Sequence, residues 1–192
     1  MDASARQLKR MVYAALMAAL TAAGALIAIP IGPVPMVLQN LFIMLAGLLL
    51  GGRWGLISVA VYLLAGAVGL PVFAGGSGGV GKLIGPTGGY LLGFAAAAYL
   101  IGVISEKGRG RVVMDVLAML AGTAVIYAVG VSWLKLVTGM SFSTALAVGM
   151  VPFLPGDALK MAAAIAIARS LRPLMDGTFP GVPDIGETRA HH

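Results

Sequence analysis

The sequence predicts an all-α integral membrane protein, and three observations lead to this fold class. Of the 192 residues, 59% are hydrophobic and only 10% are charged, whereas soluble domains carry about 25% charged residues. The mean hydropathy is accordingly high, at +0.98. Apolar runs recur along the chain, and their lengths approach the roughly 20 residues that a membrane helix needs. Basic residues gather in alternate connections between these runs, as they do in proteins that cross a membrane several times.

Six apolar runs predict six transmembrane helices in one domain. They cover residues 11–29, 37–51, 54–69, 89–105, 112–134 and 145–171. The last run is interrupted by PFLPGD. We expect its helix to begin near Pro155, because proline is favoured in a first helical turn and Asp157 suits the positive end of the helix dipole. The expected membrane domain is 1–175, followed by a C-terminal cytoplasmic tail, 176–192. His191 and His192 in this tail are set aside as candidate remains of a purification tag.

The basic residues predict the orientation of the six spans. With six spans both termini share one side, and ten of the thirteen basic residues fall on it: Arg6, Lys9, Arg10, Arg53, Lys107, Arg109, Arg111, Arg169, Arg172 and Arg189. Lys82 and Lys135 lie in the opposite connections. Both termini are therefore expected in the cytoplasm, with the protein in the cytoplasmic (inner) membrane. The net charge of +6 then favours anionic lipid as the partner. No nucleic-acid partner is expected, because no basic patch is interleaved with aromatic residues.

A glycine-rich connection, 71–88, contains GGSGGVGKLIG, which has the glycine and lysine spacing of a nucleotide-binding P-loop. That motif needs Ser or Thr after its lysine and a strand before it, but Leu83 follows Lys82. The connection is also expected on the outer side, where there is no ATP. Two interpretations stay open. It is either a flexible connector or a cradle over a ligand, since irregular backbone at membrane depth is tolerated where it lines a cavity.

Polar residues gather at the outer helix ends beside this connection. Asp157 and Lys160 are three positions apart and share one helix face, and charges within membrane helices indicate functional sites. In the alternative interpretation Asp157 caps its helix while Lys160 pairs with it or extends to the surface. Gln39 and Tyr90 begin the second and fourth helices. An apolar pocket with a few convergent polar groups is typical of a small-molecule site.

Catalytic chemistry has few residues available. There is no cysteine and no histidine before the C-terminal pair, so thiol catalysis is excluded and no metal or cofactor is expected. Ser77 and Lys82 form the one conceivable nucleophile and base pair for an intramembrane enzyme. A channel is disfavoured, because repeated charged positions along a pore are absent. Both classes remain alternatives to a protein that binds a small molecule.

Four blocks, IGPVPMVLQNL, GLPVFAGGSGG, GPTGGYL and PGDALK, occur in this order and resemble the BioY family. These proteins are the biotin-specific substrate-binding S components of energy-coupling factor (ECF) vitamin transporters, and the resemblance runs from about Ala14 to Lys160 and beyond. It implies an S-component-type bundle of six helices with an extracellular-side vitamin pocket. The implied function is high-affinity capture of biotin for transport by an ECF-type ABC transporter. An S component for another vitamin, or a biotin transporter that works without partners, remains an alternative.

The resemblance also implies roles for individual residues. Biotin has a ureido ring with two N–H donors and a carbonyl, a sulfur-containing ring and a valerate carboxylate. Asp157 and Lys160, the charged residues of PGDALK, match the family's ligand-site residues and suit the ureido group. The remaining candidates are the ring-packing Phe73 and Tyr90, the hydrogen-bonding Gln39 and backbone of Gly75 and Gly76, and Lys82 for the carboxylate.

The first helix carries two stripes of alanine at four-residue spacing, where another helix can approach closely. One stripe is Ala14, Ala18 and Ala22, and the other is Ala15, Ala19 and Ala23. The resemblance implies that this face contacts a membrane-embedded coupling subunit, which in turn assembles with two cytoplasmic ATPases. In the alternative interpretation the stripes pack inside the bundle.

Overall fold

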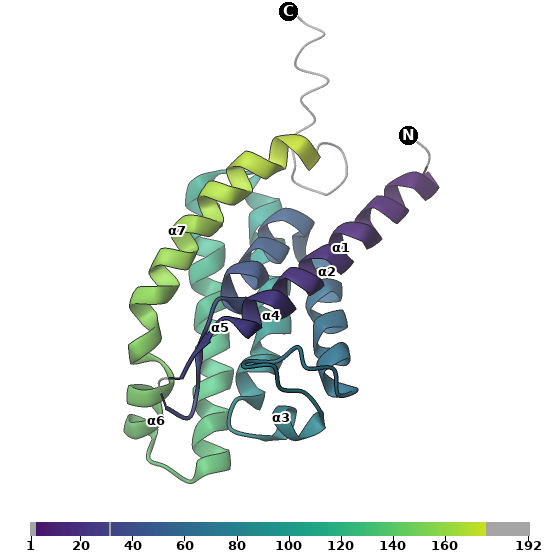
Figure 1. Cartoon of the computed structure of the whole chain (residues 1–192). Coiled ribbons are helices and arrows are strands. Elements are labelled where there is room, and N and C mark those ends of the chain that lie inside the picture. The colour runs from purple at the N-terminus through teal and green to yellow at the C-terminus, as the bar shows by residue number, and fades with distance from the viewer. Residues whose placement is uncertain (1–2, 31, 176–192) are drawn as a thin grey trace, which may run out of the picture.

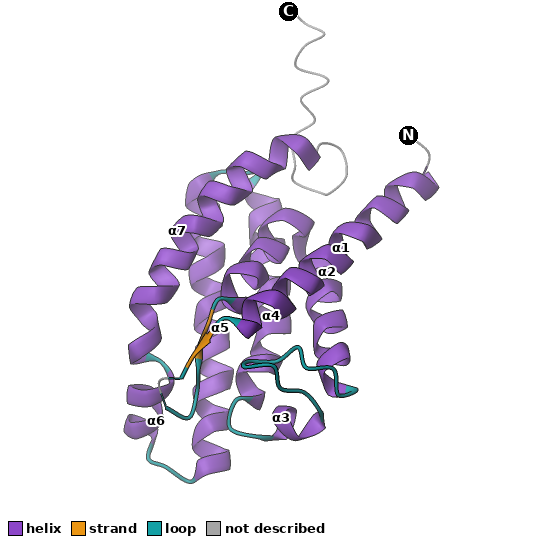
Figure 2. Cartoon of the chain, viewed as in Figure 1, coloured by secondary structure: helices purple, strands orange, loops and turns teal. Residues whose placement is uncertain are grey.

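A computed structural model describes residues 3–30 and 32–175 and is predominantly helical (Figures 1 and 2). The helices are α1 (Ala3–Leu26), α2 (Gln39–Ala67), α3 (Val80–Ile84), α4 (Gly88–Gly108), α5 (Val112–Thr138), α6 (Phe142–Gly149) and α7 (Leu154–Leu171). Short 3₁₀ turns cover Val151–Phe153 and Arg172–Met175. Strands β1 (Ala28–Ile29) and β2 (Met36–Val37) pair antiparallel. The predicted all-α class is confirmed, whereas the proposed tail, 176–192, lies outside the described residues.

Four helical segments among the described residues are long and apolar enough to cross a membrane. They are Gln39–Ala67, Gly88–Gly108, Val112–Thr138 and Phe142–Met175. The first of these contains the predicted helices 37–51 and 54–69 in a single helical run. The run is not straight, because Gly51 has φ 78° and ψ 178°, a left-handed conformation that glycine adopts without steric cost.

The chain reverses direction at Gly51. A Cβ atom on Gly55 would lie 3.1 Å from the carbonyl oxygen of Ala46, although nine residues of straight helix would separate the two by about 13 Å. Figure 1 shows α2 ascending to this turn and descending again. The sequence GGRW therefore marks a turn between two helical segments, as the sequence predicted.

Two short helices were not predicted. Helix α3 lies within the glycine-rich connection, and α6 precedes the break at PFLPGD. The predicted start of the last helix is confirmed, because α7 begins at Leu154 with a proline in its first turn and Asp157 one turn in. Helix α1 begins at Ala3, whereas the predicted span began at residue 11. The prediction followed the apolar run alone, and the polar and basic residues before it are helical as well.

Helix α4 packs between α2 and α5, while α1 lies on α2, and α7 packs on α2 and α5. The α2–α4 contact depends on small residues: a Cβ atom on Gly102 would clash with the backbone of Gly51 and Gly52. Two clusters of buried apolar side chains fill the bundle. One contains Tyr62, Phe73 and Tyr90, and the other contains Met44, Leu49 and Met119.

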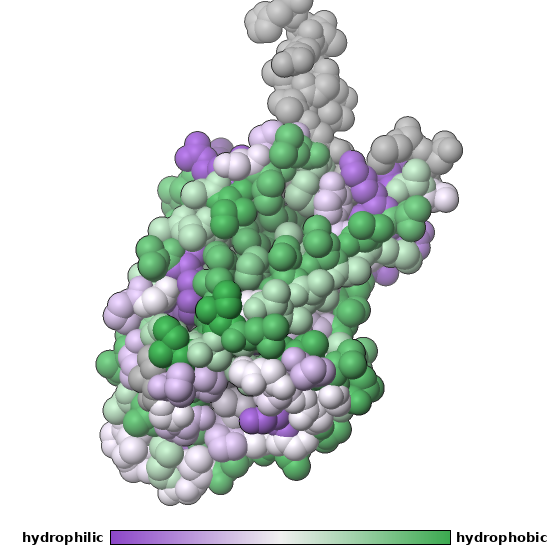
Figure 3. Space-filling view, in the orientation of Figure 1, coloured by the Kyte–Doolittle hydropathy of each residue, from purple (hydrophilic) through white to green (hydrophobic). Residues whose placement is uncertain are grey.

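The two ends of the bundle differ. Figure 1 places the first turns of α1, the turn within α2 and the last turns of α7 at one end, and α3 and α6 at the other. We call these the terminal end and the α3–α6 end. Figure 3 shows an apolar surface over α1 and α7 between more hydrophilic ends. Leu16 on α1 and Leu159 on α7 are among the exposed apolar side chains of these two helices. An apolar surface of this kind suits contact with lipid.

Candidate functional site

Two adjoining cavities lie at the α3–α6 end of the bundle. The first, of about 140 Å³, is bounded by the turn before α2, the glycine-rich connection, α3 and the start of α4. The second, of about 40 Å³, lies between that turn, α4, α5 and the start of α7. Both are lined by Val34, Pro35, Val37, Tyr90 and Phe94. Because they share these walls, we describe them as two lobes of one site.

Asp157 is the charged centre of the second lobe. It is only 1% exposed, and its two carboxylate oxygens accept from different partners. The hydroxyl of Tyr127 on α5 donates to Oδ2 at 2.5 Å, and the ammonium of Lys160, one turn further along α7, donates to Oδ1 at 3.0 Å. A buried carboxylate requires such partners, because an unpaired charge in an apolar interior is very unfavourable.

This group retains hydrogen-bonding capacity. A carboxylate offers about four lone-pair sites and an ammonium has three donors. Within the described residues Asp157 accepts two hydrogen bonds and Lys160 donates one. Both side chains also line the second lobe. The alternative interpretation, in which Asp157 caps its helix and Lys160 pairs with it, is therefore confirmed in one part, because the two side chains form an ion pair. The pair nevertheless faces the cavity, where it can offer both donors and acceptors to a ligand.

Two amide side chains at the start of α2 have polar atoms without partners among the described residues. Gln39 is 1% exposed and lines the first lobe. Its side chain interacts with the buried hydroxyl of Tyr62, but its buried Nε2 atom makes no hydrogen bond of ordinary length. Asn40 lines the second lobe, and its Oδ1 atom is buried and unpaired as well. Buried polar groups are nearly always hydrogen-bonded in native proteins. One unpaired donor and one unpaired acceptor beside a cavity therefore indicate a missing polar ligand or water.

Tyr90 and Phe73 form apolar walls. The ring of Tyr90 lines both lobes, while its hydroxyl donates to the carbonyl of Gly149 in α6 at 2.8 Å. Phe73 lines the first lobe and makes an edge-to-face contact with Tyr62, with ring centroids 5.6 Å apart. Both rings are thus held in place by contacts outside the cavity and present flat surfaces to it.

The glycine-rich connection forms a wall of the first lobe. Phe73 and Ser77 form a short antiparallel bridge, and Ala74 and Ser77 line the lobe. The connection is therefore a folded cradle. Gly75 and Gly76 are exposed and do not line either lobe. Their amides donate to the carbonyls of Ala25 and Phe73, so the backbone groups predicted to contact a ligand are already used within the chain.

Lys82 on α3 is exposed and lines the first lobe. The enzyme alternative required it to act with Ser77. In the described part of the chain no hydrogen bond joins the two side chains, and the Ser77 hydroxyl donates to the carbonyl of Ala74 at 2.9 Å. The structure thus brings together Asp157, Lys160, Tyr90, Gln39, Phe73 and Lys82 around the two lobes.

Sequence reasoning missed Tyr127 and Asn40. Tyr127 lies within an apolar run, where a tyrosine gives no periodic signal, and its partner Asp157 is 30 positions away. Asn40 directly follows Gln39 in the block IGPVPMVLQNL and was part of the resemblance, but no role was assigned to it.

The alanine stripes of α1 separate into a buried and an exposed set. Ala14 and Ala18 are 3% and 6% exposed and lie in the two core clusters, and Ala22 packs against one of these clusters. The prediction that this stripe contacts a partner subunit does not hold for Ala14, Ala18 and Ala22, because these residues face the bundle. Ala15 and Ala19 are exposed, as is Ala23.

Taken together, these features define a helical membrane protein with a candidate small-molecule site at one end of its bundle. The sequence model of the BioY family matches residues 1–177. The chain therefore belongs to the BioY family, and the resemblance found in the sequence is confirmed.

Curated relatives and a solved structure agree with this assignment. The probable biotin transporter BioY of Pyrococcus horikoshii is 44% identical over 164 residues, which cover 85% of this chain and 96% of the relative. The biotin transporter BioY of Thermotoga maritima is 41% identical over 167 residues, covering 87% and 98%. A crystal structure of the S-component for biotin from an ECF-type ABC transporter matches with a TM-score of 0.83 and 35% identity, covering 90% of this chain and 94% of that one.

Proposed function

We propose that this chain captures biotin and carries it across the membrane as the substrate-binding S component of an ECF-type ABC transporter. The observation that carries the proposal is the group formed by Tyr127, Asp157 and Lys160 in the wall of the second lobe. Family membership, the relatives and the matching crystal structure support biotin as the ligand.

The ureido ring of biotin suits the second lobe. Asp157 accepts its N–H groups, and Lys160 donates to its carbonyl with an N–H group that is not used for Asp157. The unpaired Oδ1 of Asn40 is a further acceptor in the same lobe. A buried polar site of this kind discriminates strongly, because an analogue that lacks a hydrogen-bonding group leaves the protein's partner unpaired.

The rings and the valerate chain suit the apolar walls and the first lobe. Tyr90 and Phe73 present aromatic surfaces, and the valerate carboxylate requires only donors. Two donor side chains line the first lobe, the buried Nε2 of Gln39 and the exposed ammonium of Lys82. In this arrangement the carboxylate lies nearer the surface than the ureido ring.

Binding of radiolabelled biotin to the purified protein in detergent tests this function. We expect saturable binding that excess unlabelled biotin competes away and excess thiamine or riboflavin does not. Biotin methyl ester, which lacks the carboxylate charge, is expected to compete more weakly than biotin. A folded, monodisperse sample that binds thiamine or riboflavin in place of biotin contradicts the ligand assignment.

The membrane arrangement is a proposal as well. We infer six spans in the cytoplasmic membrane: α1, the two segments of α2, α4, α5 and α7, with the terminal end in the cytoplasm and the site facing outward. Because the chain has no cysteine, single cysteines can map it. A cysteine replacing the exposed Ser141 before α6 should react with a membrane-impermeant maleimide on intact cells, and one replacing the exposed Ser170 at the end of α7 should not. The opposite pattern contradicts the orientation.

The exposed stripe of α1, Ala15, Ala19 and Ala23, is the proposed contact for a coupling subunit that assembles with two ATPases. Its small side chains allow another helix to approach closely. Replacing Ala19 by Leu should abolish co-purification with the coupling module and leave biotin binding unchanged. Unchanged co-purification would place the contact elsewhere.

A further inference from the structure

Helix α7 carries both charged residues of the proposed site, yet little of it is buried. Its buried residues are Asp157, Ala164 and Ala168. Five further apolar residues of α7 are only partly buried against the core: Met161, Ala163, Ile165, Ile167 and Leu171. In a membrane, helices are held together by van der Waals packing and interhelical hydrogen bonds, so partly buried side chains contribute fewer of the packing contacts. Apolar packing therefore holds α7 less firmly than it holds α2 or α4, in each of which many residues are buried.

Polar contacts attach both ends of α7 to α5. At the α3–α6 end Asp157 accepts from Tyr127. At the terminal end Arg172, which directly follows α7, pairs with Asp115 in the first turn of α5. Arg172 and Asp115 are both buried. Each end of α7 is thus fixed to the same neighbouring helix by a buried carboxylate contact.

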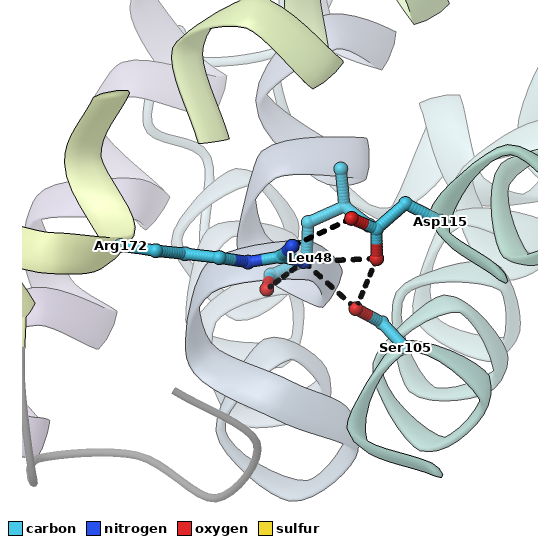
Figure 4. Close-up of polar contacts among 4 residues, drawn as sticks. All are labelled: Leu48, Ser105, Asp115 and Arg172. Carbon is cyan, nitrogen blue, oxygen red and sulfur yellow. Dashed lines mark hydrogen bonds and ion pairs between the residues drawn. The ribbon is translucent and has the colours of Figure 1, made fainter. Parts of the chain in front are cut away.

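Arg172 is held by three helices (Figure 4). Its Nη1 and Nη2 atoms donate to the two oxygens of Asp115 at 2.6 and 2.9 Å, the bidentate geometry that gives arginine pairs their directional specificity. Nη2 also lies 2.9 Å from the hydroxyl of Ser105 in α4 and 3.1 Å from the carbonyl oxygen of Leu48 in α2. Ser105 itself donates to Asp115 at 2.6 Å.

The turn in α2 makes the Leu48 carbonyl available to Arg172. In an uninterrupted α-helix this carbonyl accepts from the N–H of Gly52, four residues on. The left-handed Gly51 separates the two groups, and the N–H of Gly52 donates to Oε1 of Glu106 instead, at 3.1 Å. Two charged side chains from other parts of the chain therefore replace one helix hydrogen bond, and the end of α7 is joined to the turn of α2.

We propose that Arg172 is a positioning residue for the ligand site: it anchors the far end of α7 and so sets where Asp157 and Lys160 lie at the cavity. This inference rests on the proposed function. The site is about 22 Å from the anchor, because 15 residues of helix separate them at 1.5 Å each. Arg172 therefore acts through the placement of the helix, without contact to the ligand.

Biotin affinity of an Arg172→Lys variant tests the role of this anchor. Lysine keeps the positive charge but lacks the planar fork of donors that reaches Asp115, Ser105 and Leu48 together. We expect the Kd for biotin to rise about fivefold at a temperature where the variant is fully folded. The matched control is Val59→Ala, which removes buried apolar volume from α2 in the other core cluster and lowers thermal stability, while every hydrogen-bond partner of Arg172 stays in place. Wild-type affinity in Arg172→Lys, or an equal loss in Val59→Ala, overturns the proposal.

A distance measurement without ligand separates this inference from the proposed function. Cysteines replacing the exposed Leu159 of α7 and Ser132 of α5 carry spin labels near the site in an otherwise cysteine-free chain. We expect Arg172→Lys, and Arg172→Ala where it folds, to shift or broaden the distance distribution between the labels. Val59→Ala should leave it narrow. An unchanged distribution in Arg172→Lys overturns the anchor even if biotin binds. A changed distribution in a chain that does not bind biotin supports the anchor and refutes the proposed ligand.

Discussion

Two ion pairs lie at opposite ends of the bundle, one between the end of α7 and α5 and one within α7. They differ in how completely their hydrogen-bonding groups are satisfied. At the terminal end Arg172 and Asp115 exchange a bidentate contact, and Ser105 and the Leu48 carbonyl complete their hydrogen bonding. At the α3–α6 end Asp157 and Lys160 make one contact to each other and one to Tyr127. They line a cavity beside the unpaired Oδ1 of Asn40.

This difference distinguishes a structural contact from a binding site. Each cluster combines an aspartate, a basic side chain and a hydroxyl group, so the kind of chemical group does not separate them. Spare donors and acceptors next to a cavity do, because they are unfavourable in the empty protein and become favourable when a ligand completes them. The fully bonded cluster at the terminal end has no unused group to offer a ligand, whereas the incomplete cluster can be completed by one.

The largest effect on stability is expected for Asp115→Ala. It leaves the Arg172 guanidinium buried without its counter-ion, and removing one partner of a buried pair costs about 3–5 kcal/mol. Unfolding followed by titration with SDS in mixed micelles measures the loss. The control is the double variant Asp115→Leu with Arg172→Met, in which no charge is left unpaired, and it should recover most of the stability. A loss below 1 kcal/mol in Asp115→Ala would show that water reaches the pair.

At the α3–α6 end the main effect is expected on affinity. Asp157→Asn keeps the size of the side chain but replaces one acceptor oxygen by a donor and leaves Lys160 without its counter-ion. We expect biotin binding to weaken at least about tenfold, or 1.4 kcal/mol, in the radiolabelled binding assay. Ser132→Ala, an exposed change on neighbouring α5, is the control. Equal affinities of Asp157→Asn and wild type would remove the carboxylate from the binding site.

The two clusters also differ in how well sequence reasoning found them. Asp157 and Lys160 are one helical turn apart, so their shared face can be read from their spacing. Arg172 and Asp115 are 57 positions apart, and no local pattern relates them. In the sequence Arg172 counted only as one of the basic residues expected on the cytoplasmic side, because it follows an apolar run. Burial against a carboxylate from another helix can only be recognised once the helices are packed.

The fold elements, too, could be predicted where their cause is local in the sequence and not where it depends on packing. The glycines of GGRW and the prolines of PFLPGD act locally on backbone conformation, and the structure has breaks at Gly51 and before Leu154. The inward and outward faces of α1 could not be assigned, because both alanine stripes have the same spacing and composition. Only the packing of Ala14 and Ala18 against other helices separates the buried stripe from the exposed one.

A smaller loss of biotin affinity is expected when the hydroxyl group of Tyr127 is removed. The hydroxyl group of Tyr90 provides the comparison. Tyr127→Phe removes the donor 2.5 Å from Asp157, and hydrogen bonds to charged groups contribute about 1.5–3 kcal/mol. We expect about a three- to tenfold rise in the Kd for biotin, because the carboxylate loses part of its orientation. Tyr90→Phe is the matched control. It keeps the ring that lines the cavity and loses only a bond to the Gly149 carbonyl, so stability should fall with little change in affinity. The reverse ranking of the two variants would contradict this view of the site.

The smallest effect is expected at Lys82, because this cation is exposed on α3 while it lines the first lobe. Water and salt screen its attraction for the valerate carboxylate, with a screening length of about 8 Å at physiological ionic strength. Lys82→Gln should therefore raise the Kd for biotin only about two- to threefold at low salt, and the difference from wild type should shrink as salt is added. Binding isotherms at low and high sodium chloride measure both effects.

Lys135→Gln, an exposed change on α5 outside the walls of both lobes, controls for net charge. If Lys82→Gln and Lys135→Gln raise the Kd for biotin equally, Lys82 acts only through the net charge of the protein. If Lys82→Gln alone loses affinity, and biotin methyl ester binds to it as it does to wild type, the carboxylate lies beside α3.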